Sequence, residues 1–195
     1  DVIADTYFRM GKFDEAMAKY KEALEVKPYF WSNPKIGYIC AFKEDYSEAQ
    51  KWIDKYINIA LSPSIKRGGY LWKGFYHYWR GSLEKSLNDL QGAEELAEAV
   101  GDNFGKAFVS FFKVWIYYDR GELELSRKYN EAWFNVYIKN DPNNEQYYKA
   151  LFNFNLGLIE LKEKKIDSAK ASLAKMKSLF PEISLPIQKE EATFY

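Results

Sequence analysis

The sequence predicts an all-α protein, a solenoid of about five helical hairpins, and three observations lead to this fold class. Apolar residues recur with the period of an α-helix along most of the chain, and no segment shows the alternation of a β-strand. Proline and glycine interrupt this pattern at intervals, at points where helices are expected to end. One short phrase also recurs five times, and internal repeats of about 20–50 residues are typical of solenoids.

The repeated phrase marks the turn inside each hairpin. It opens on a large apolar residue, and successive copies are 33, 37, 40 and 43 positions apart: Phe13, Tyr46, Leu83, Leu123 and Ile166. Three positions later each copy has a small residue: Ala16, Ala49, Ser86, Ser126 and Ala169. Segments of helical period lie on both sides of each phrase, so each copy is predicted to be two helices joined by a three-residue turn.

The elements follow in chain order from these turns. The first helices of the hairpins are predicted over 1–10, 34–43, 67–80, 103–119 and 145–163. Their partners are predicted over 13–26, 46–60, 83–100, 122–139 and 166–179. The stop signals between hairpins are Lys27-Pro28, Ser62-Pro63, Gly101-Asp102, Asp141-Pro142-Asn143-Asn144 and Phe180-Pro181. The hairpins therefore cover approximately 1–28, 31–62, 64–101, 103–140 and 144–180.

Small residues also occur inside the first helices, at Ala4, Gly37, Gly74 and Gly157. Because glycine in a helix costs about 1 kcal/mol relative to alanine, we expect a close contact to compensate. The small residues three positions into each second helix supply the other side of that contact. Val114 fills this position in the fourth hairpin, whose helices are expected to be spaced slightly wider.

These positions resemble the tetratricopeptide repeat. Residues 1–28 match its W-x2-L-G-x2-Y…A-x3-F…P pattern at Ile3-Ala4, Tyr7, Gly11, Phe13, Ala16, Tyr20, Ala23 and Pro28. The second hairpin retains Ile36-Gly37, Tyr46, Ala49, Ile53 and Pro63, and the fifth retains Leu156-Gly157, Ile166, Ala169, Leu173 and Pro181. The third and fourth copies are longer, have Ser for Ala, and resemble the longer repeats of bacterial regulators related to the maltose-regulon activator.

The resemblance implies a right-handed superhelix of helical hairpins that forms a single array over residues 1–195. It also implies that Asp1 falls after the usual start of its helix and that 188–195 is the start of a sixth hairpin. Since the terminal repeats of solenoids carry polar caps, we expect the chain to be an internal piece of a larger protein. Uncapped ends of this kind would allow self-association.

Composition excludes several classes of function. The chain of 195 residues has 28 basic and 28 acidic side chains, which argues against a nucleic-acid binder because such proteins present a basic face. Cys40 and His77 are the single cysteine and the single histidine, so no cofactor, no metal site and no enzymatic activity is predicted.

Hydropathy and the N-terminal sequence bear on location. The longest apolar stretch, 108–118, is far shorter than the approximately 20 residues that a membrane span needs, so no membrane insertion is expected. No signal sequence is recognisable, and a cytoplasmic location is favoured.

The predicted binding residues come from the resemblance, in which the first helices line a concave face. Aromatic residues make up 18% of the chain, and many of them fall on that face. The predicted peptide- or ligand-binding residues are Lys35, Tyr38, Phe42, Trp72, Phe75, Tyr78, Trp79, Phe108, Phe111, Phe112, Trp115, Tyr118 and Phe154. Either they form an apolar groove for a peptide, since aromatic side chains dominate binding hot spots, or they pack as a bulky core between helices.

One binding mode of the family can be set aside. Chaperone-tail adaptors of the family hold a C-terminal carboxylate with basic and amide side chains from three repeats. The matching positions here hold Asp1, Asp5, Lys35, Gly68 and Trp72, where two acids would repel such a ligand.

Two functions from different classes remain. The first is a non-catalytic scaffold that binds a partner peptide or a neighbouring domain in an aromatic-rich groove. The alternative is a ligand-sensing module of a bacterial signalling protein or transcriptional regulator, which rests on the longer third and fourth repeats.

Overall fold

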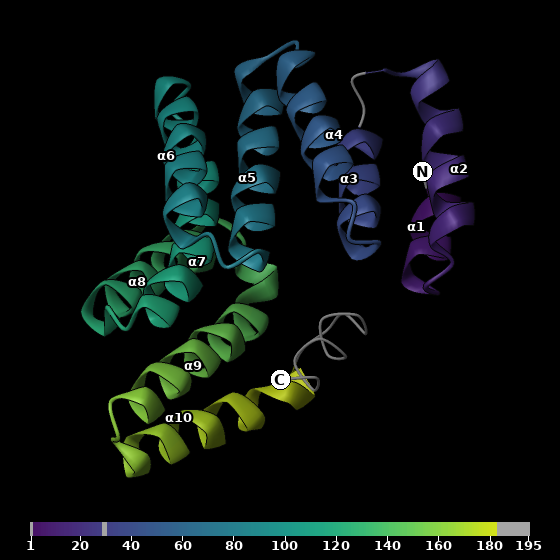
Figure 1. Ribbon diagram of the computed structural model, residues 1–195. Helices are drawn as coiled ribbons and strands as arrows, with labels where there is room; N and C mark the ends of the chain where they lie inside the picture. The colour runs from purple at the N-terminus through teal and green to yellow at the C-terminus, as the bar shows by residue number, and fades with distance from the viewer. Residues whose placement is uncertain (1, 29–30, 183–195) are drawn as a thin grey trace. The chain divides into compact units, whose positions relative to one another are not determined.

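The computed structural model describes residues 2–28 and 31–182, which divide into two compact units, 1–101 and 102–195. The first unit contains α1 (Val2–Arg9), α2 (Phe13–Val26), α3 (Ser32–Phe42), α4 (Tyr46–Asn58), α5 (Pro63–Trp79) and α6 (Leu83–Ala99) (Figure 1). The second contains α7 (Asn103–Arg120), α8 (Leu123–Asn140), α9 (Glu145–Lys162) and α10 (Ile166–Leu179), with short 3-10 turns at Pro142–Asn144 and Phe180–Glu182. No strand occurs in the described ranges, so the predicted all-α array of helical hairpins is confirmed.

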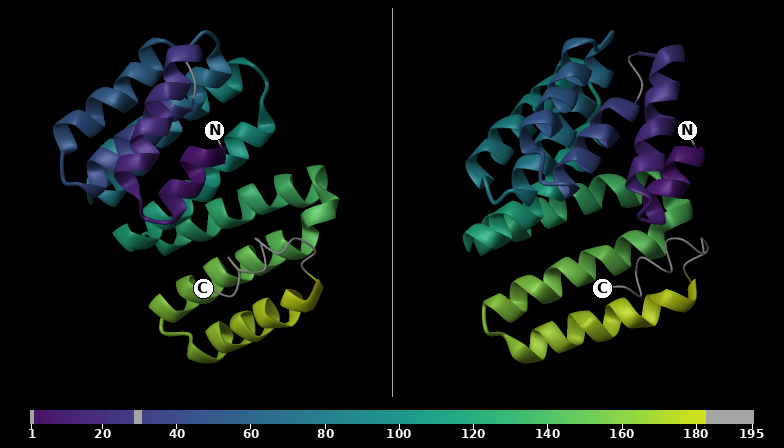
Figure 2. Two further views of the ribbon diagram at one scale, coloured as in Figure 1. Left: turned by 90° about the vertical axis from the view of Figure 1, so that its right-hand side faces the viewer. Right: turned by 45° about the vertical axis from the view of Figure 1, so that its right-hand side comes forward.

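Consecutive helices pair as hairpins within each unit. In the first unit α1 packs on α2, α3 on α4 and α5 on α6, while α2 also contacts α3 and α4 also contacts α5. In the second unit α7 packs on α8, α8 contacts α9, and α9 packs on α10. The two views of Figure 2 show α9 and α10 running side by side. This nearest-neighbour contact pattern is that of a solenoid.

Two helices begin earlier than predicted. Helix α3 begins at Ser32 instead of residue 34, and α5 begins at Pro63 instead of residue 67. The Ser62 hydroxyl accepts a hydrogen bond from the Ile65 N–H, and Pro63 occupies the first turn, where its missing N–H costs nothing. Ser62-Pro63 therefore starts a helix as well as separating two hairpins, because α4 has already ended at Asn58.

The turns inside the five hairpins share one backbone geometry. The residue two positions before each second helix has a positive φ: Gly11, Glu44, Gly81, Gly121 and Lys164, at 71°, 63°, 68°, 78° and 64°. The next residue donates its N–H to a carbonyl five positions back, as Lys12 does to Tyr7 and Lys165 to Glu160, each at 2.9 Å. This is the hydrogen bond of a Schellman cap, and it explains why the phrase recurs at every turn.

The predicted contact between small residues is confirmed. A Cβ atom added to Gly37 would lie 2.9 Å from the Ala49 carbonyl oxygen, so the two helices approach as closely as glycine permits. In the third and fourth hairpins the serine hydroxyl takes part as well. Ser86 Oγ donates to the Gly74 carbonyl at 2.7 Å, and Ser126 Oγ donates to the Val114 carbonyl at 2.9 Å.

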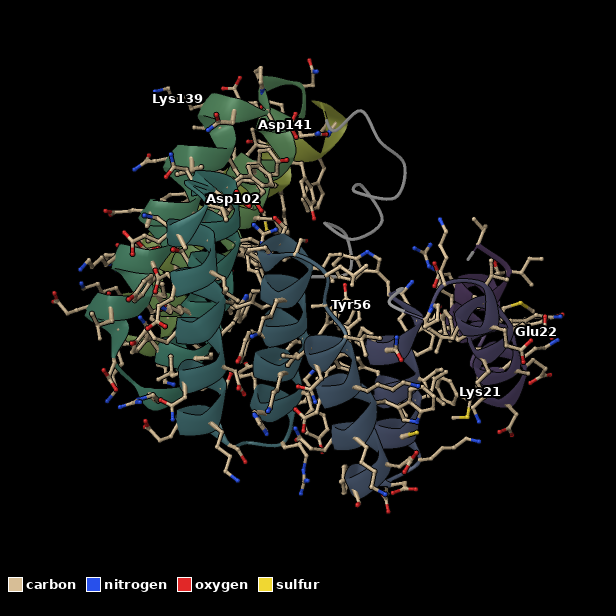
Figure 3. The ribbon with its side chains drawn as sticks, turned by 90° about the horizontal axis from the view of Figure 1, so that it is seen from above. Lys21, Glu22, Tyr56, Asp102, Lys139 and Asp141 are labelled. Atoms are coloured by element: carbon tan, nitrogen blue, oxygen red, sulfur yellow. The ribbon has the colours of Figure 1, made fainter. Side chains whose placement is uncertain are left out.

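Each unit has its own core. In the first unit the core residues include Ile36, Ile39 and Ile53, which are fully buried. Figure 3 shows Tyr56 among the helices, whereas Lys21 and Glu22 on α2 point outward. In the second unit Trp133 is the largest buried side chain, and its indole N–H donates to Asn130 at 2.9 Å. A buried Trp needs such a partner for its N–H.

Candidate functional site

A cluster of aromatic rings from three successive first helices forms the candidate site in the first unit. We call it the aromatic surface and define it by Phe8 of α1, Phe42 of α3, and Trp72, Phe75 and Trp79 of α5. The ring centroids are 5.9 Å apart for Phe8 and Phe42, and 5.2 Å apart both for Phe42 and Trp79 and for Phe75 and Trp79. These separations and the inclined ring planes are those of favourable aromatic pairs. The hairpin repeat therefore brings together rings that lie up to 71 residues apart in sequence.

Part of this surface faces solvent. Phe42 is 49% exposed and Trp79 is 48% exposed, although they contact each other. Tyr38 lies beneath them at 3% exposure, with its ring centroid 5.0 Å from those of Trp72 and Trp79. Its hydroxyl donates to the Trp72 carbonyl oxygen at 2.9 Å. Tyr38 thus fixes the position of α5 against α3, and the exposed rings are held on a rigid base.

One hollow opens beside Trp79 toward α1. Its volume is about 250 Å³, and its walls include Phe8, Tyr38, Trp72, Phe75 and Trp79. Polar groups line the other side of this hollow: Asp5, Arg9, Tyr20 and Lys35.

The polar wall is organised around Asp5, which accepts a hydrogen bond from the Tyr20 hydroxyl at 2.6 Å and forms an ion pair with Lys35. Partial burial by itself raises the pKa of Asp5, but the hydrogen bonds from Lys35 and Tyr20 outweigh it and hold that pKa below its ordinary value. The carboxylate is therefore ionised at neutral pH, and its charge is balanced by Lys35.

A second hollow lies on the other side of Trp79. Its volume is about 470 Å³, and Phe42, Tyr46, Tyr76, Trp79 and Arg80 line it. The Arg80 guanidinium carbon is 4.0 Å from the centroid of the Tyr46 ring, which is a cation–π contact. The Tyr76 hydroxyl donates to the Tyr46 carbonyl oxygen at 3.1 Å and ties α5 to α4. Trp79 thus separates two hollows that each contain an arginine.

Seven of the predicted binding residues belong to the first unit, and the structure brings them together. Phe42, Trp72, Phe75 and Trp79 are members of the aromatic surface, and Tyr78 is 6.4 Å from Phe75 between ring centroids. Tyr38 is buried beneath the surface and Lys35 is engaged with Asp5, so these two support the site from below and from its edge.

The six predicted residues of the second unit lie on α7 and α9: Phe108, Phe111, Phe112, Trp115, Tyr118 and Phe154. Phe111 packs inside the hairpin against Trp133, with 5.2 Å between ring centroids. Trp115 contacts Phe154 at 5.8 Å, which joins the fourth and fifth hairpins. Phe111, Trp115 and Phe154 therefore pack between elements of their own unit, whereas Phe108 is 39% exposed.

Sequence reasoning missed Arg80, Tyr46 and Tyr76 as site residues. Arg80 directly follows the last residue of α5, and Tyr46 opens the second helix of its hairpin. The slots of the repeat predict only the faces of first helices, so neither residue was expected to line a hollow. The pairing of a Tyr at a turn with an Arg at the next turn, 34 positions later, is the signal that could have revealed them.

The positions that match the family's carboxylate clamp have other contacts in this structure. Lys35 is paired with Asp5, while Gly68 is covered by the Trp31 ring, 3.0 Å from where a Cβ would lie. Asp1 lies outside the described residues.

The single histidine and cysteine both have structural surroundings. His77 Nδ1 lies 2.6 Å from Asp89 Oδ2 across the third hairpin, and both side chains are largely buried. Cys40 is buried in the core of the first unit, where burial raises the pKa of its thiol. Within residues 2–28 and 31–182, no three side chains of His, Cys, Asp or Glu gather as metal ligands would. Over the same residues, no helix is long and apolar enough to cross a membrane.

A third hollow, of about 340 Å³, lies on the fifth hairpin in the second unit. Its walls are mostly apolar and include Leu158, Leu161, Ile166 and Leu173. Leu161, Ile166 and Leu173 are exposed there, whereas Ile53, the counterpart of Leu173 in the second hairpin, is fully buried and lies against Gly37 of α3. The sixth helix predicted over 188–195 lies outside the described residues.

Comparison with known proteins agrees with the repeat pattern. Residues 2–30 match the sequence model of the tetratricopeptide repeat. No curated protein sequence matches the chain.

Solved structures with the same fold cover nearly all of the chain. BtubC from P. vanneervenii superposes with a TM-score of 0.71 at 11% identity, over 90% of this chain and 74% of its own. A Podosopora anserina protein with nearly identical TPR-like repeats gives 0.68 at 10% identity, over 92% of each chain.

A third structure, YrrB, is described as a TPR protein with an unusual peptide-binding site. It gives a TM-score of 0.52 at 19% identity, over 98% of this chain and 89% of its own. At these identities the similarity concerns the fold. The first hairpin is thus a tetratricopeptide repeat, and the chain as a whole has the fold of tetratricopeptide-repeat proteins.

Proposed function

We propose that the chain is a non-catalytic interaction scaffold whose first unit binds a peptide segment of a partner protein on the aromatic surface. The observation that carries this proposal is the pair Phe42 and Trp79. The two rings come from different hairpins, pack against each other at 5.2 Å, and still leave about half of each side chain in water.

The energetics favour binding at this pair. Two half-exposed aromatic rings offer apolar area whose burial contributes about 25 cal/mol per Å². Their neighbours Tyr38 and Phe75 already restrict the motion of Trp79, so a ligand need not order it on binding. Large aromatic side chains held in this way are typical of hot spots in protein interfaces.

The fold supports the same class of function. Tetratricopeptide repeats present the faces of successive first helices side by side, and the peptide-binding site named for YrrB belongs to a protein of this fold. The ligand-sensing alternative is not favoured by the comparisons, and the cytoplasmic location remains a prediction from the sequence.

The test is peptide binding by variants of the surface. Linear 12-residue peptides are selected from a random phage-displayed library on the purified chain, and the strongest are synthesised with a fluorophore. Fluorescence polarisation then gives Kd for the unaltered chain and for the double variant Phe42→Ala/Trp79→Ala. We expect the double substitution to weaken binding by at least about 100-fold, since hot-spot truncations cost 2 kcal/mol or more each.

A matched control is Phe104→Ala. Phe104 is 45% exposed on α7 and packs against Tyr137 with 4.2 Å between ring centroids, so this substitution removes a comparable exposed ring from the second unit and leaves the aromatic surface intact. Its Kd should equal that of the unaltered chain. Equal Kd values for the double variant and the unaltered chain would show that peptides bind elsewhere.

A further inference from the structure

Two arginines flank the aromatic surface, one in each hollow beside Trp79. Arg9 lines the hollow toward α1, and Arg80 lines the hollow toward Tyr46. Both side chains are exposed, and neither has a carboxylate partner among the described residues. Basic side chains near the ends of first helices also interact favourably with helix dipoles, so their position in the sequence alone does not call for a ligand.

The charge balance of the two hollows does call for one. The charged residues that line them are Asp5, Arg9, Lys35 and Arg80. Asp5 and Lys35 neutralise each other in an ion pair, which leaves the two guanidinium groups as uncompensated charges on either side of the exposed rings. Because the chain as a whole has a net charge of zero, this local excess is a property of the site.

The surroundings of each arginine strengthen its attraction for an anion. The Arg80 guanidinium carbon lies 4.0 Å from the centroid of the Tyr46 ring, and its Nη1 donates to the Tyr76 hydroxyl at 3.5 Å, so two aromatic side chains of the hollow hold this cation in place. Arg9 shares its hollow with Phe8, Phe75 and Trp79. A carboxylate placed against an arginine beside apolar rings loses water on binding, and charge-assisted hydrogen bonds are stronger where water is excluded.

We infer that the ligand of the aromatic surface is an acidic peptide with one apolar or aromatic anchor and carboxylate side chains on both sides of it. The anchor packs on Phe42 and Trp79, one carboxylate pairs with Arg9, and the other pairs with Arg80. This inference rests on the proposed function and specifies the chemistry of its partner. Arg9 and Arg80 are not among the positions with which family members hold a C-terminal carboxylate. The one basic residue at those positions, Lys35, is already paired with Asp5.

The phage selection described above tests this inference through the sequences that it enriches. We expect Asp and Glu to be enriched on both sides of a Trp, Phe or Leu, relative to the unselected library. The double variant Arg9→Gln/Arg80→Gln should bind the selected peptide about tenfold more weakly, as expected for two partly desolvated ion pairs. Arg9→Lys/Arg80→Lys should retain most of the affinity because it keeps both charges.

The control variant is Lys85→Gln/Lys128→Gln, which removes two exposed charges from α6 and α8 that line neither hollow. Its Kd should be unchanged. Raising the salt concentration from 50 to 500 mM should weaken binding to the unaltered chain more than to the arginine variant, because screening acts on exposed ion pairs.

The outcomes separate the inference from the proposed function. Peptides that lose affinity in Phe42→Ala/Trp79→Ala, but show no acidic enrichment or no loss in Arg9→Gln/Arg80→Gln, overturn the inference and leave the proposed function in place. Peptides whose binding survives Phe42→Ala/Trp79→Ala overturn both, as does a selection that enriches no peptide.

Discussion

At the scale of single residues, the hairpin turns show how one backbone conformation is met by different amino acids. Gly11, Gly81 and Gly121 adopt a positive φ without steric cost, whereas Glu44 and Lys164 adopt nearly the same φ with a Cβ atom present. The left-handed conformation costs a residue with a side chain about 1–2 kcal/mol. The second and fifth turns therefore carry strain that the other three do not.

Replacing these two residues by glycine should relieve the strain. We expect Glu44→Gly and Lys164→Gly each to raise the free energy of unfolding by about 0.5–1 kcal/mol, because the greater entropy of glycine in the unfolded chain offsets part of the gain. Urea denaturation followed by circular dichroism measures this. Conversely, Gly81→Ala should lower the free energy of unfolding by about 1 kcal/mol, because alanine disfavours the positive φ of this turn. Steric overlap does not contribute, since an added Cβ meets no atom within 4 Å. A loss of stability in Glu44→Gly would refute this account.

At the scale of the hairpin, the same glycine position has different surroundings in different copies. In the second hairpin a Cβ on Gly37 would lie 2.9 Å from the Ala49 carbonyl oxygen, which is backbone and cannot move aside cheaply. In the fifth hairpin a Cβ on Gly157 would have its nearest neighbour, Ser172 Cβ, at 3.5 Å, an ordinary contact. Helices α9 and α10 are therefore less tightly packed at this point than α3 and α4.

The two alanine substitutions should accordingly have opposite signs. Gly37→Ala is expected to destabilise by about 1–2 kcal/mol, because overpacking outweighs the better helix propensity of alanine. Gly157→Ala is expected to stabilise the protein by up to about 1 kcal/mol, because alanine has the better helix propensity and no overpacking opposes it here. Urea denaturation of both variants under the same conditions decides the question. A shift of the same sign in both would mean that the repeat position, and not its local spacing, determines the effect.

At the scale of the molecule, the division into two units places the whole candidate site in one of them. The aromatic surface, both of its hollows and the two arginines come from residues 5–80, within the unit that spans 1–101. The core of that unit is also made by its own helices, among them α1 to α5. Repeat proteins contact mainly their sequence neighbours, so a subset of hairpins can fold as a stable piece.

A fragment of residues 1–101 should therefore fold and bind. We expect its far-ultraviolet circular dichroism to be helical, and its Kd for a peptide selected on the whole chain to agree within about threefold, since a difference of that size is under 1 kcal/mol. Calorimetry or fluorescence polarisation gives the Kd. A helical fragment with no measurable affinity would mean that residues of the second unit complete the site.

The sequence by itself determined the helical hairpins, their turns and the contact between small residues, because these depend on local periodicity and on caps that neighbouring residues form. It also placed Phe42, Trp72, Phe75 and Trp79 on one face, since the repeat puts equivalent positions of successive helices side by side.

Only the tertiary structure decided which aromatic residues remain exposed. Tyr38 and Phe42 are four positions apart on α3, yet Tyr38 is covered by the rings of α5 and Phe42 is half-exposed. Periodicity gives the direction of a side chain along its helix, but burial depends on the size and offset of side chains from the next hairpin. The ion pair that occupies Lys35 and the stacking of Arg80 on Tyr46 join residues 30 and 34 positions apart, and no local pattern specifies such pairs.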